Sequence, residues 1–270
     1  MQDLKISLLQ SELEWENPVS NRHHFSELID GIADTDLILL PEMFSTGFTM
    51  NSTDLAETMD GETVHWMKAQ AAEKDAVICG SLIIKENNKF FNRLIWMRPD
   101  GSVETYDKRH LFRMANENEH FSAGTSKLVV ELKGWKICPM VCYDLRFPVW
   151  SRNKAETDRE NYAHWEYDIL LYIANWPAPR VKAWEKLLFA RAIENQCYVA
   201  AVNRIGEDGK GISYSGSSTL IDAKGETIWK AKDNSTEVKT HVISKKNLEA
   251  FREKFPVGMD GDRFEIRNLK

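Results

Sequence analysis

The sequence predicts an α/β protein with a single domain, built on either one large mixed sheet or two sheets. Short apolar runs alternate with helical patterns along the whole chain, as that class requires. No internal repeat, low-complexity segment or linker divides the 270 residues. The hydrophobic share of 43% and the charged share of 28% are ordinary for a globular protein. Periodicity leaves a doubly wound sheet, a barrel and a two-sheet sandwich open.

The first half of the chain combines apolar runs of strand length with amphipathic helical patterns. Phe25, Leu28 and Ile32 recur at helical spacing, so a helix is expected around them. Bounded apolar runs of four to nine residues are read as strands. The predicted strands cover residues 4–9, 37–40, 76–84, 92–97 and 103–106, and the predicted helices cover residues 18–33 and 64–74.

The second half repeats this alternation and contains the strongest helical pattern. Trp184, Leu188 and Ala192 belong to its apolar stripe. The polar stretch 151–166 is expected to be a solvated helix or loop, and residues 256–270 show no clear periodicity. The predicted strands cover residues 137–141, 169–174, 197–202, 217–221, 227–229 and 242–243, and the predicted helices cover residues 147–152, 182–196 and 245–255.

Charge and composition exclude several functional classes. The formal net charge is −6 and no basic run is present, which argues against nucleic-acid binding. The chain contains no stretch of about 18 apolar residues, so no membrane span is expected. The first residues lack the features of a secretory signal. Of the four cysteines, three lie in apolar, strand-like runs. This usage predicts reduced thiols in a cytoplasmic protein rather than a disulfide framework.

Cys142 ends a short apolar run that reads as a buried strand, and a probable helix follows it. A side chain at a strand end can project into a cleft, and a backbone N–H at a helix start can point at an anion. A nucleophile with an oxyanion hole needs this geometry. The alternative is that Cys142 is only a small buried apolar residue, which cysteine often is.

Glu42 and Lys108 also follow predicted strands. Glu42 comes directly after the run 37–40 and a proline, an unusual place for a charge, and the aromatic residues beyond it suggest a packed loop. Lys108 leaves a strand among mixed charges and rings. Taken singly, each residue would be read as a solvated surface charge, because Lys and Glu are rarely buried.

A metal site is not expected. His110 and His120 are close in sequence, but their spacing fits no compact ligand motif. Cys138 and Cys142 are not followed by the second cysteine pair that a zinc site would need.

Three segments in chain order resemble the nitrilase superfamily of carbon–nitrogen hydrolases, whose catalytic set is Glu-Lys-Cys. The segments are Leu-Leu-Pro-Glu ending at Glu42, Tyr-Asp-Lys-Arg-His-Leu around Lys108, and Val-Cys-Tyr-Asp-Leu-Arg-Phe-Pro around Cys142. Each segment is weak evidence alone. The three together outweigh the alternatives that Cys142 is only a buried apolar residue and that Glu42 and Lys108 are only surface charges. The resemblance covers nearly the whole chain. It implies one domain over residues 1–270, a four-layer α-β-β-α sandwich, and pairing into homodimers or larger homo-oligomers.

Within that superfamily the chain looks most similar to the omega-amidase branch, the 2-oxoglutaramate amidase type. The supporting segments are residues 142–148, 175–177, 191–198 and 202–204. The resemblance implies hydrolysis of the terminal amide of 2-oxo dicarboxylate monoamides to the 2-oxo acid and ammonia, through a thioester and without a cofactor. Ala223 departs from the proline that many relatives carry, and no catalytic consequence is expected.

The resemblance also implies roles for individual residues. Cys142 is the nucleophile, Glu42 is the general base, and Lys108 stabilises the oxyanion with the backbone N–H of Tyr143. A second glutamate holds the lysine, with Glu117 favoured over Glu119 for that place. Candidate cations for the distal carboxylate of the substrate are Arg146 and Arg180, and candidate pocket walls are Phe44, Phe112 and Trp176.

Other functions stay open at this point. An N-carbamoyl amino acid, another amide or a nitrile could be the substrate of a superfamily member. A catalytically silent binding protein and a metal-dependent amidase are further alternatives from other classes.

Overall fold

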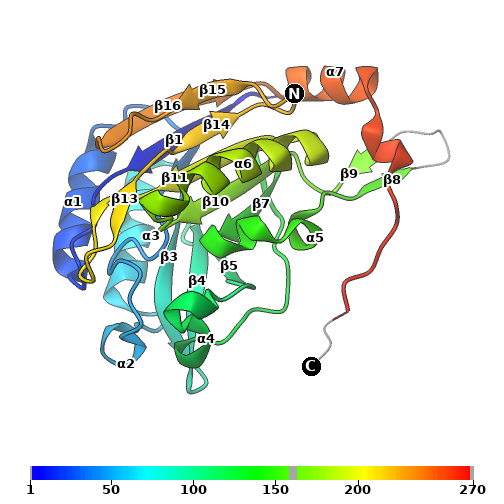
Figure 1. Cartoon of the computed structure of the whole chain (residues 1–270). Coiled ribbons are helices and arrows are strands. Elements are labelled where there is room, and N and C mark those ends of the chain that lie inside the picture. Colours follow the sequence, from blue (N-terminus) through cyan, green and yellow to red (C-terminus); the bar gives the residue numbers. More distant parts are fainter. Residues whose placement is uncertain (1, 158–162, 268–270) are drawn as a thin grey trace.

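Two six-stranded sheets pack face to face in the computed structural model, which describes residues 2–157 and 163–267 (Figure 1). The strand order of the first sheet is β16 (Glu237–Ile243), β1 (Leu4–Gln10), β2 (Leu37–Leu39), β3 (Val77–Glu86), β4 (Lys89–Met97) and β5 (Val103–Asp107). The strand order of the second sheet is β15 (Thr227–Lys230), β14 (Thr219–Ile221), β11 (Tyr198–Asn203), β10 (Ile169–Ala174), β7 (Trp135–Val141) and β6 (Val130–Leu132).

The alternation of side chains along each strand divides the apolar residues between two cores. In β2, Leu37 and Leu39 belong to the core between the sheets, whereas Ile38 belongs to the core beneath the first pair of helices. Ile137 of β7 and Val199 of β11 join the core between the sheets from the other side. Both faces of the central strands are therefore buried, which explains why these strands read as continuous apolar runs.

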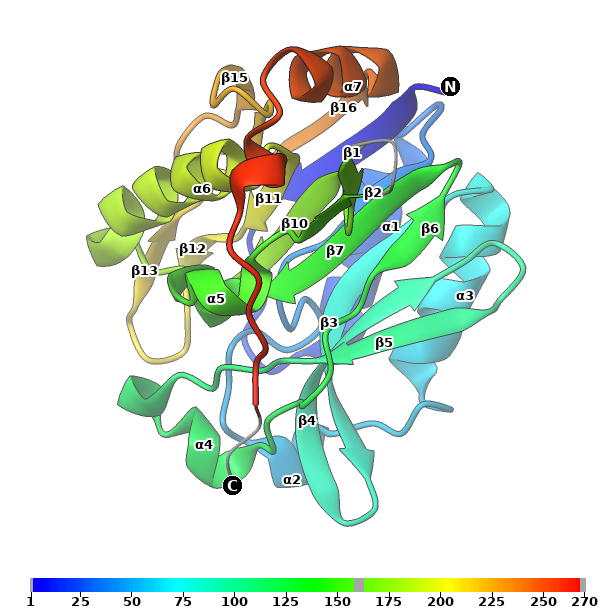
Figure 2. The same cartoon turned by 90° about the vertical axis from the view of Figure 1, so that its right-hand side faces the viewer.

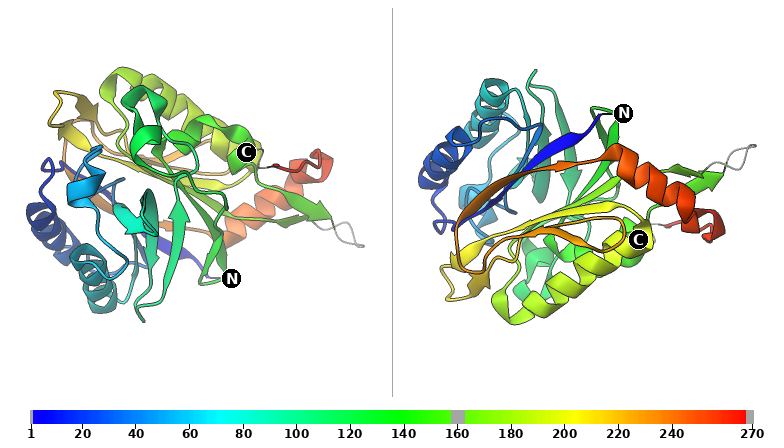
Figure 3. Two further views of the ribbon diagram at one scale, coloured as in Figure 1. Left: turned by 90° about the horizontal axis from the view of Figure 1, so that it is seen from below. Right: turned by 90° about the horizontal axis from the view of Figure 1, so that it is seen from above.

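Helices cover the outer face of each sheet (Figure 3). On the first sheet lie α1 (Pro18–Asp30) and α3 (Glu62–Lys74), which bury Phe25 and Met67. On the second lies α6 (Val181–Asn195), which buries Trp184 and Leu188. The order helix, sheet, sheet, helix confirms the four-layer α-β-β-α sandwich and selects it from the three architectures that the periodicity allowed.

The remaining elements are short. The helices are α2 (Ser52–Leu55), α4 (Glu117–His120), α5 (Pro148–Ser151) and α7 (Lys245–Lys254), with 3₁₀ turns η1 (Arg113–Ala115), η2 (Cys142–Arg146), η3 (Ala178–Arg180) and η4 (Val257–Asp260). Two small hairpins pair β8 (Ala155–Thr157) with β9 (Ala163–Trp165) and β12 (Ile205–Glu207) with β13 (Ser213–Ser215). Beyond α7 the chain runs along the outside of the molecule (Figure 2). No helix among the described residues is long and apolar enough to cross a bilayer.

The segment 151–166 differs from the solvated helix or loop expected for it. The antiparallel hairpin of β8 and β9 occupies its described part, and residues 158–162 lie outside the described residues. Tertiary contacts hold the base of this hairpin: the side-chain amide of Asn153 donates to the carbonyls of Tyr167 at 2.9 Å and Asn195 at 3.1 Å. Such partners are distant in sequence, so local polarity could not indicate them.

The connection between β3 and β4 is also shorter than expected. The strands extend to Glu86 and from Lys89, leaving Asn87 and Asn88 as a two-residue turn with φ values of 49° and 59°. Asparagine tolerates this left-handed backbone better than most residues, which suits it to a tight hairpin.

Candidate active site

The ends of four strands bring the predicted catalytic residues together. Glu42 follows β2 and Lys108 follows β5, both in the first sheet, while Cys142 follows β7 in the second. Glu117 enters from α4, and Asn175 follows β10, which runs parallel to β7. Because the two sheets face each other, residues far apart in the chain meet at one end of the sandwich.

Lys108 lies at the centre of this group. Its Nζ lies 2.8 Å from Glu42 Oε1 and 3.0 Å from both carboxylate oxygens of Glu117. Nζ also lies 5.0 Å from the centre of the Phe48 ring, within range of a cation–π contact. The ammonium therefore joins two carboxylates and still has a face on the cleft.

Burial makes these charges depend on one another. Lys108 is 1% exposed, and Glu42 and Glu117 are fully buried. Burial lowers the pKa of Lys108, but Glu117 and Glu42 outweigh it and hold that pKa above its ordinary value, so the ammonium stays charged. Burial and the neighbouring Glu42 raise the pKa of Glu117, while Lys108 acts in the opposite direction.

Cys142 sits on a sharp turn at the start of η2. Its φ is 44°, in the left-handed region that a non-glycine residue rarely adopts. Its Sγ lies 3.7 Å from the carbonyl oxygen of Asn175. Burial raises the pKa of the thiol well above its ordinary value, and the charge and hydrogen bond of Glu42 add to that shift. The thiol is therefore protonated at rest, in a buried site that also holds the Glu42 carboxylate.

Asp144 fixes the cysteine turn. Its buried carboxylate accepts hydrogen bonds from the backbone N–H of Val141 at 3.1 Å and the hydroxyl of Tyr106 at 2.8 Å. It also accepts from the backbone N–H of His110 at 3.0 Å, and the ring Nδ1 of His110 lies 2.8 Å from the same oxygen. The His110 ring stacks on Phe147 at 3.7 Å between centroids. These bonds tie the strained turn to the strand that carries Lys108.

Asn175 holds Glu42 from the opposite side. Its backbone N–H donates to Glu42 Oε2 at 2.9 Å, and its side-chain amide donates to the Glu42 carbonyl. The neighbouring Trp176 is fixed by Asn203, whose Oδ1 accepts from the Trp176 N–H at 2.7 Å. The ends of β2, β10 and β11 are thus joined beneath the cleft.

A cleft of about 860 Å³ opens above Lys108 and Cys142. Most of the predicted binding residues line it, namely Phe112, Tyr143, Arg146, Trp176 and Arg180. The Arg146 guanidinium lies 4.9 Å from the Trp176 ring, and the Arg180 guanidinium lies 5.7 Å from the Phe112 ring. The wall therefore presents cations held on aromatic faces within reach of the nucleophile.

The prediction that Phe44 lines the pocket is wrong. Its ring is fully buried beneath the first sheet, 5.6 Å from the Phe25 ring and 5.5 Å from the Trp66 ring. A Cβ at Gly80 would come within 2.8 Å of it, so glycine makes room for the ring there. Phe48, four residues on, lines the cleft instead. The loop after β2 turns between these positions, which the residue types alone do not reveal.

The two candidate glutamates differ in where their side chains lie. Glu117 contacts Lys108, and its Oε2 also accepts the backbone N–H of Phe112 at 2.5 Å. Glu119 is exposed on the same short helix. The two residues lie about half a helical turn apart, so one side chain points inward and the other outward.

Two buried amides have site contacts that the sequence reading did not assign. Asn175 appeared there only as part of a family segment, and Asn92 only as the start of a strand. Asn92 donates from Nδ2 to Glu42 Oε1 at 2.8 Å. The available signal was an asparagine next to the apolar and aromatic residues of this strand, because a buried amide needs partners.

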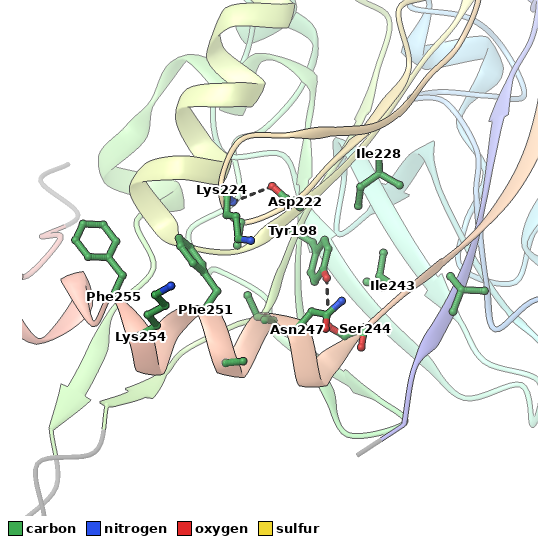
Figure 4. Close-up of a pocket in the computed structure, with 14 residues that line it drawn as sticks. Tyr198, Asp222, Lys224, Ile228, Ile243, Ser244, Asn247, Phe251, Lys254 and Phe255 are labelled. Carbon is green, nitrogen blue, oxygen red and sulfur yellow. Dashed lines mark hydrogen bonds between the residues drawn. The ribbon is translucent and has the colours of Figure 1, made fainter.

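A second groove of about 880 Å³ lies between α7 and the turn that joins β14 to β15 (Figure 4). The Tyr198 hydroxyl donates to the Ser244 carbonyl at 3.2 Å on its wall, and Lys224 Nζ lies 5.8 Å from the Phe251 ring. None of the described residues that line this groove is a cysteine, a glutamate or a histidine. The residues predicted for catalysis therefore lie at the cleft that contains Cys142 and not at this groove.

The sequence pattern of the family described as carbon-nitrogen hydrolase matches residues 5–253. The chain belongs to the carbon-nitrogen hydrolase family. It follows that the predicted activity class, a hydrolase of carbon–nitrogen bonds other than peptide bonds, is confirmed.

Relatives within the carbon-nitrogen hydrolase family resemble the chain over its full length. It is 46% identical to the omega-amidase YafV of Yersinia enterocolitica, with 98% of this chain and 99% of the relative covered. It is 32% identical to the 2-oxoglutaramate amidase of Bacillus subtilis strain 168, with 93% and 95% covered. XC1258 of Xanthomonas campestris, a CN-hydrolase superfamily protein solved with an arsenic adduct in its active site, superposes with a TM-score of 0.95 at 46% identity, covering 99% and 100%.

Proposed function

We propose that this protein is an omega-amidase that hydrolyses the terminal amide of 2-oxo dicarboxylate monoamides such as 2-oxoglutaramate and 2-oxosuccinamate. The observation that carries the proposal is the buried ion pair of Lys108 with Glu42 in the same site as the Cys142 thiol, at the base of a cleft walled by two arginines. The similarity to an omega-amidase and to a 2-oxoglutaramate amidase supports this choice of substrate.

The reaction begins when Glu42 takes the proton of Cys142 and the sulfur attacks the amide carbon. Negative charge then develops on the former carbonyl oxygen, where Lys108 and the backbone N–H of Tyr143 stabilise it. Glu42 returns the proton to the leaving nitrogen, and ammonia departs as the C–N bond breaks. Glu42 next activates a water that attacks the thioester, which releases the 2-oxo acid and restores the thiol.

The arginines at the cleft wall are proposed to bind the distal carboxylate of the substrate. Arg146 is exposed, and Trp176 beneath it supplies an apolar support for the guanidinium. Arg180 donates to Met114 Sδ at 2.9 Å, a weak acceptor that a carboxylate would readily replace. A substrate held at one end by an arginine and at the other by the oxyanion donors would place its amide carbon over the sulfur.

The first test is ammonia release from 2-oxoglutaramate and 2-oxosuccinamate by the wild-type protein and by Cys142→Ala. Release that the substitution abolishes supports both the substrate class and the nucleophile. If the wild-type protein releases ammonia from neither compound, the substrate proposal is overturned. Release of carbon dioxide with ammonia from an N-carbamoyl amino acid would then favour the alternative carbamoyl substrate.

Pairing into a homodimer through an outer helical layer is part of the same proposal. Val149 of α5 and Ile193 of α6 are 59% and 54% exposed on this layer. Such apolar side chains favour burial against a second copy. Light scattering coupled to size-exclusion chromatography should give twice the chain mass of 31.1 kDa. A monomer at micromolar concentration would contradict the proposal.

A reducing compartment such as the cytoplasm is proposed as the place of action. All four cysteines are free and buried, and the nucleophile must remain a thiol. Fractionation of cells of the source organism should place the protein with cytoplasmic markers, and recovery outside the cytoplasm would contradict this.

A further inference from the structure

Asn92 occupies a position between the two carboxylates of the site. Its Nδ2 donates to Glu42 Oε1 at 2.8 Å and to Glu117 Oε1 at 3.3 Å. Lys108 Nζ binds the same two oxygens at 2.8 and 3.0 Å. Each of these oxygens therefore receives one hydrogen bond from a cation and one from a neutral amide.

The charges around this pair do not balance. Glu42 and Glu117 carry two negative charges when ionised, and Lys108 supplies one positive charge. Cys142 at the start of η2 lines the same cleft as Lys108, and its thiol contributes no charge at rest. On the cleft wall, Asp208 adds a further negative charge to the surroundings. Its carboxylate accepts a hydrogen bond from the Tyr214 hydroxyl at 2.9 Å. Two buried like charges would ordinarily raise the pKa of one of them.

The orientation of the Asn92 amide follows from its partners. Ionised carboxylates only accept hydrogen bonds, so the NH₂ group must face them. The Oδ1 atom has no hydrogen-bond partner among the described residues. The side chain is fully buried, and among the described residues it donates its hydrogen bonds to the two carboxylates. Fold stability alone gives no reason for a buried amide with half of its hydrogen-bonding capacity unused.

We infer that Asn92 is a positioning residue that holds Glu42 and Glu117 in place, so that the Glu42 carboxylate is oriented for its role as the general base. A neutral donor does this without adding a second cation that would compete with Lys108 for the carboxylates. A hydrogen-bond donor to the charged form of an acid favours that form, so loss of Asn92 should move the acid limb of the pH–activity profile, which reports the general base, to higher pH. This inference rests on the proposed role of Glu42 and not on the identity of the amide substrate.

The test compares the pH profiles of Asn92→Leu, which removes the donor at similar size, and Asn92→Asp, which replaces it with an acceptor. The acid limb of kcat/KM should move up by about one pH unit in the leucine variant and further in the aspartate variant. Activity would then fall about tenfold more at acidic pH than at alkaline pH. Asn92→Ser, which keeps one donor, should shift the limb least and carries the test if the leucine variant does not fold.

A second readout is independent of the substrate. Alkylation of Cys142 by iodoacetamide, followed by mass spectrometry at that residue, needs the same proton transfer to Glu42. The pH at which the alkylation rate declines should be higher in the Asn92 variants, by the same amount as the shift in the acid limb of kcat/KM. If the proposed substrate is wrong, this shift still appears, so failure of the function and failure of the inference are distinguishable.

The matched control is Asn195→Leu. Asn195 is also fully buried, but its amide serves the backbone of Asn153 and Arg191, away from the cleft. This variant should lose thermal stability and keep the wild-type pH profile. Equal losses at every pH in the Asn92 variants, with the acid limb unmoved in both readouts, would overturn the inference and leave Asn92 a structural residue.

Discussion

The two walls of the active-site cleft are built in opposite ways. On the chemical side, Glu42, Lys108 and Glu117 are almost fully buried and hold one another at 2.8 to 3.0 Å. On the recognition side, Arg146 is exposed and Arg180 is half-buried, and each lies over an aromatic ring. The first wall is preorganised, whereas the second keeps hydrated cations available for an incoming anion.

The difference has an energetic reason. Removing charges from water costs several kcal/mol for each ion, which only close partners and further hydrogen bonds can offset. The buried group has such partners, so it can present fixed charges to a transition state without reorganisation. Exposed cations interact more weakly because water screens them, but they avoid that desolvation penalty until a substrate arrives. Substitutions on the two walls should therefore have different signatures.

The largest effect should come from Cys142→Ala. Loss of the sulfur removes the covalent step, so turnover should fall to the background rate while the fold is retained. Steady-state ammonia release measures the first, and circular dichroism with thermal unfolding measures the second. Normal turnover in this variant would contradict the thioester mechanism.

Lys108→Met should affect both catalysis and stability. Loss of an oxyanion donor of this kind lowers kcat by about 10²–10³-fold. The substitution also leaves two carboxylates buried without their cation, at a cost of about 3–5 kcal/mol. An effect confined to KM would contradict the assigned role, because the oxyanion forms only in the transition state.

The stability of that variant should depend on pH with a definite sign. Burial raises the pKa of Glu117 even beside Lys108, and loss of that cation removes the opposing effect, so the folded variant binds more protons than the unfolded chain. The variant should therefore be most stable at acidic pH and lose stability as the pH rises through the raised pKa of Glu117. Urea unfolding across the pH range measures this, and a flat difference from the wild type would contradict it.

A comparison of Glu117→Gln with Glu119→Gln tests the contrast between a buried and an exposed glutamate of the same short helix. Glutamine at 117 removes the second charge that holds Lys108, so kcat should fall by about tenfold or more, as it does when a positioning group near the chemistry is disturbed. Glutamine at exposed position 119 should leave kcat and KM unchanged. Equal effects at the two positions would show that the buried contact does not matter for turnover.

The smallest effect, and one confined to binding, is expected for Arg146→Met. Loss of a charge-assisted hydrogen bond to the substrate carboxylate should raise KM by about tenfold and leave kcat and thermal stability nearly unchanged. Lys182→Met, which removes an exposed cation that does not line the cleft, is the control. A drop in kcat without a change in KM would move Arg146 from recognition to chemistry.

Sequence patterns predicted most strands because those strands are buried on both faces. A strand such as β10 consists of six apolar residues without interruption, and no other local signal competes with that reading. The hairpin of β8 and β9 was missed because its strands are short and polar and depend on Asn153. Local patterns indicate an element when burial dictates its composition, and they fail when distant hydrogen bonds hold the element in place.

The residues of the site follow the same division. Glu42, Lys108 and Cys142 were found because each follows a strand and together they match a family pattern in chain order. Phe44 and Phe48 could not be told apart, since both are aromatic residues of one loop and only packing against Phe25 and Trp66 buries the first.

The amino-acid sequence is enough to predict the class of the fold, the order of its strands along the chain and the acid, amine and thiol at three strand ends. Those features are encoded in composition and spacing, which are local properties of a chain. The position of Asn92 between two carboxylates, and the hydrogen bonds by which Asn175 holds Glu42 across the sheets, arise from the folded structure. Such contacts depend on how two sheets pack against each other, so their partners, 25 and 133 residues apart, share no local signal.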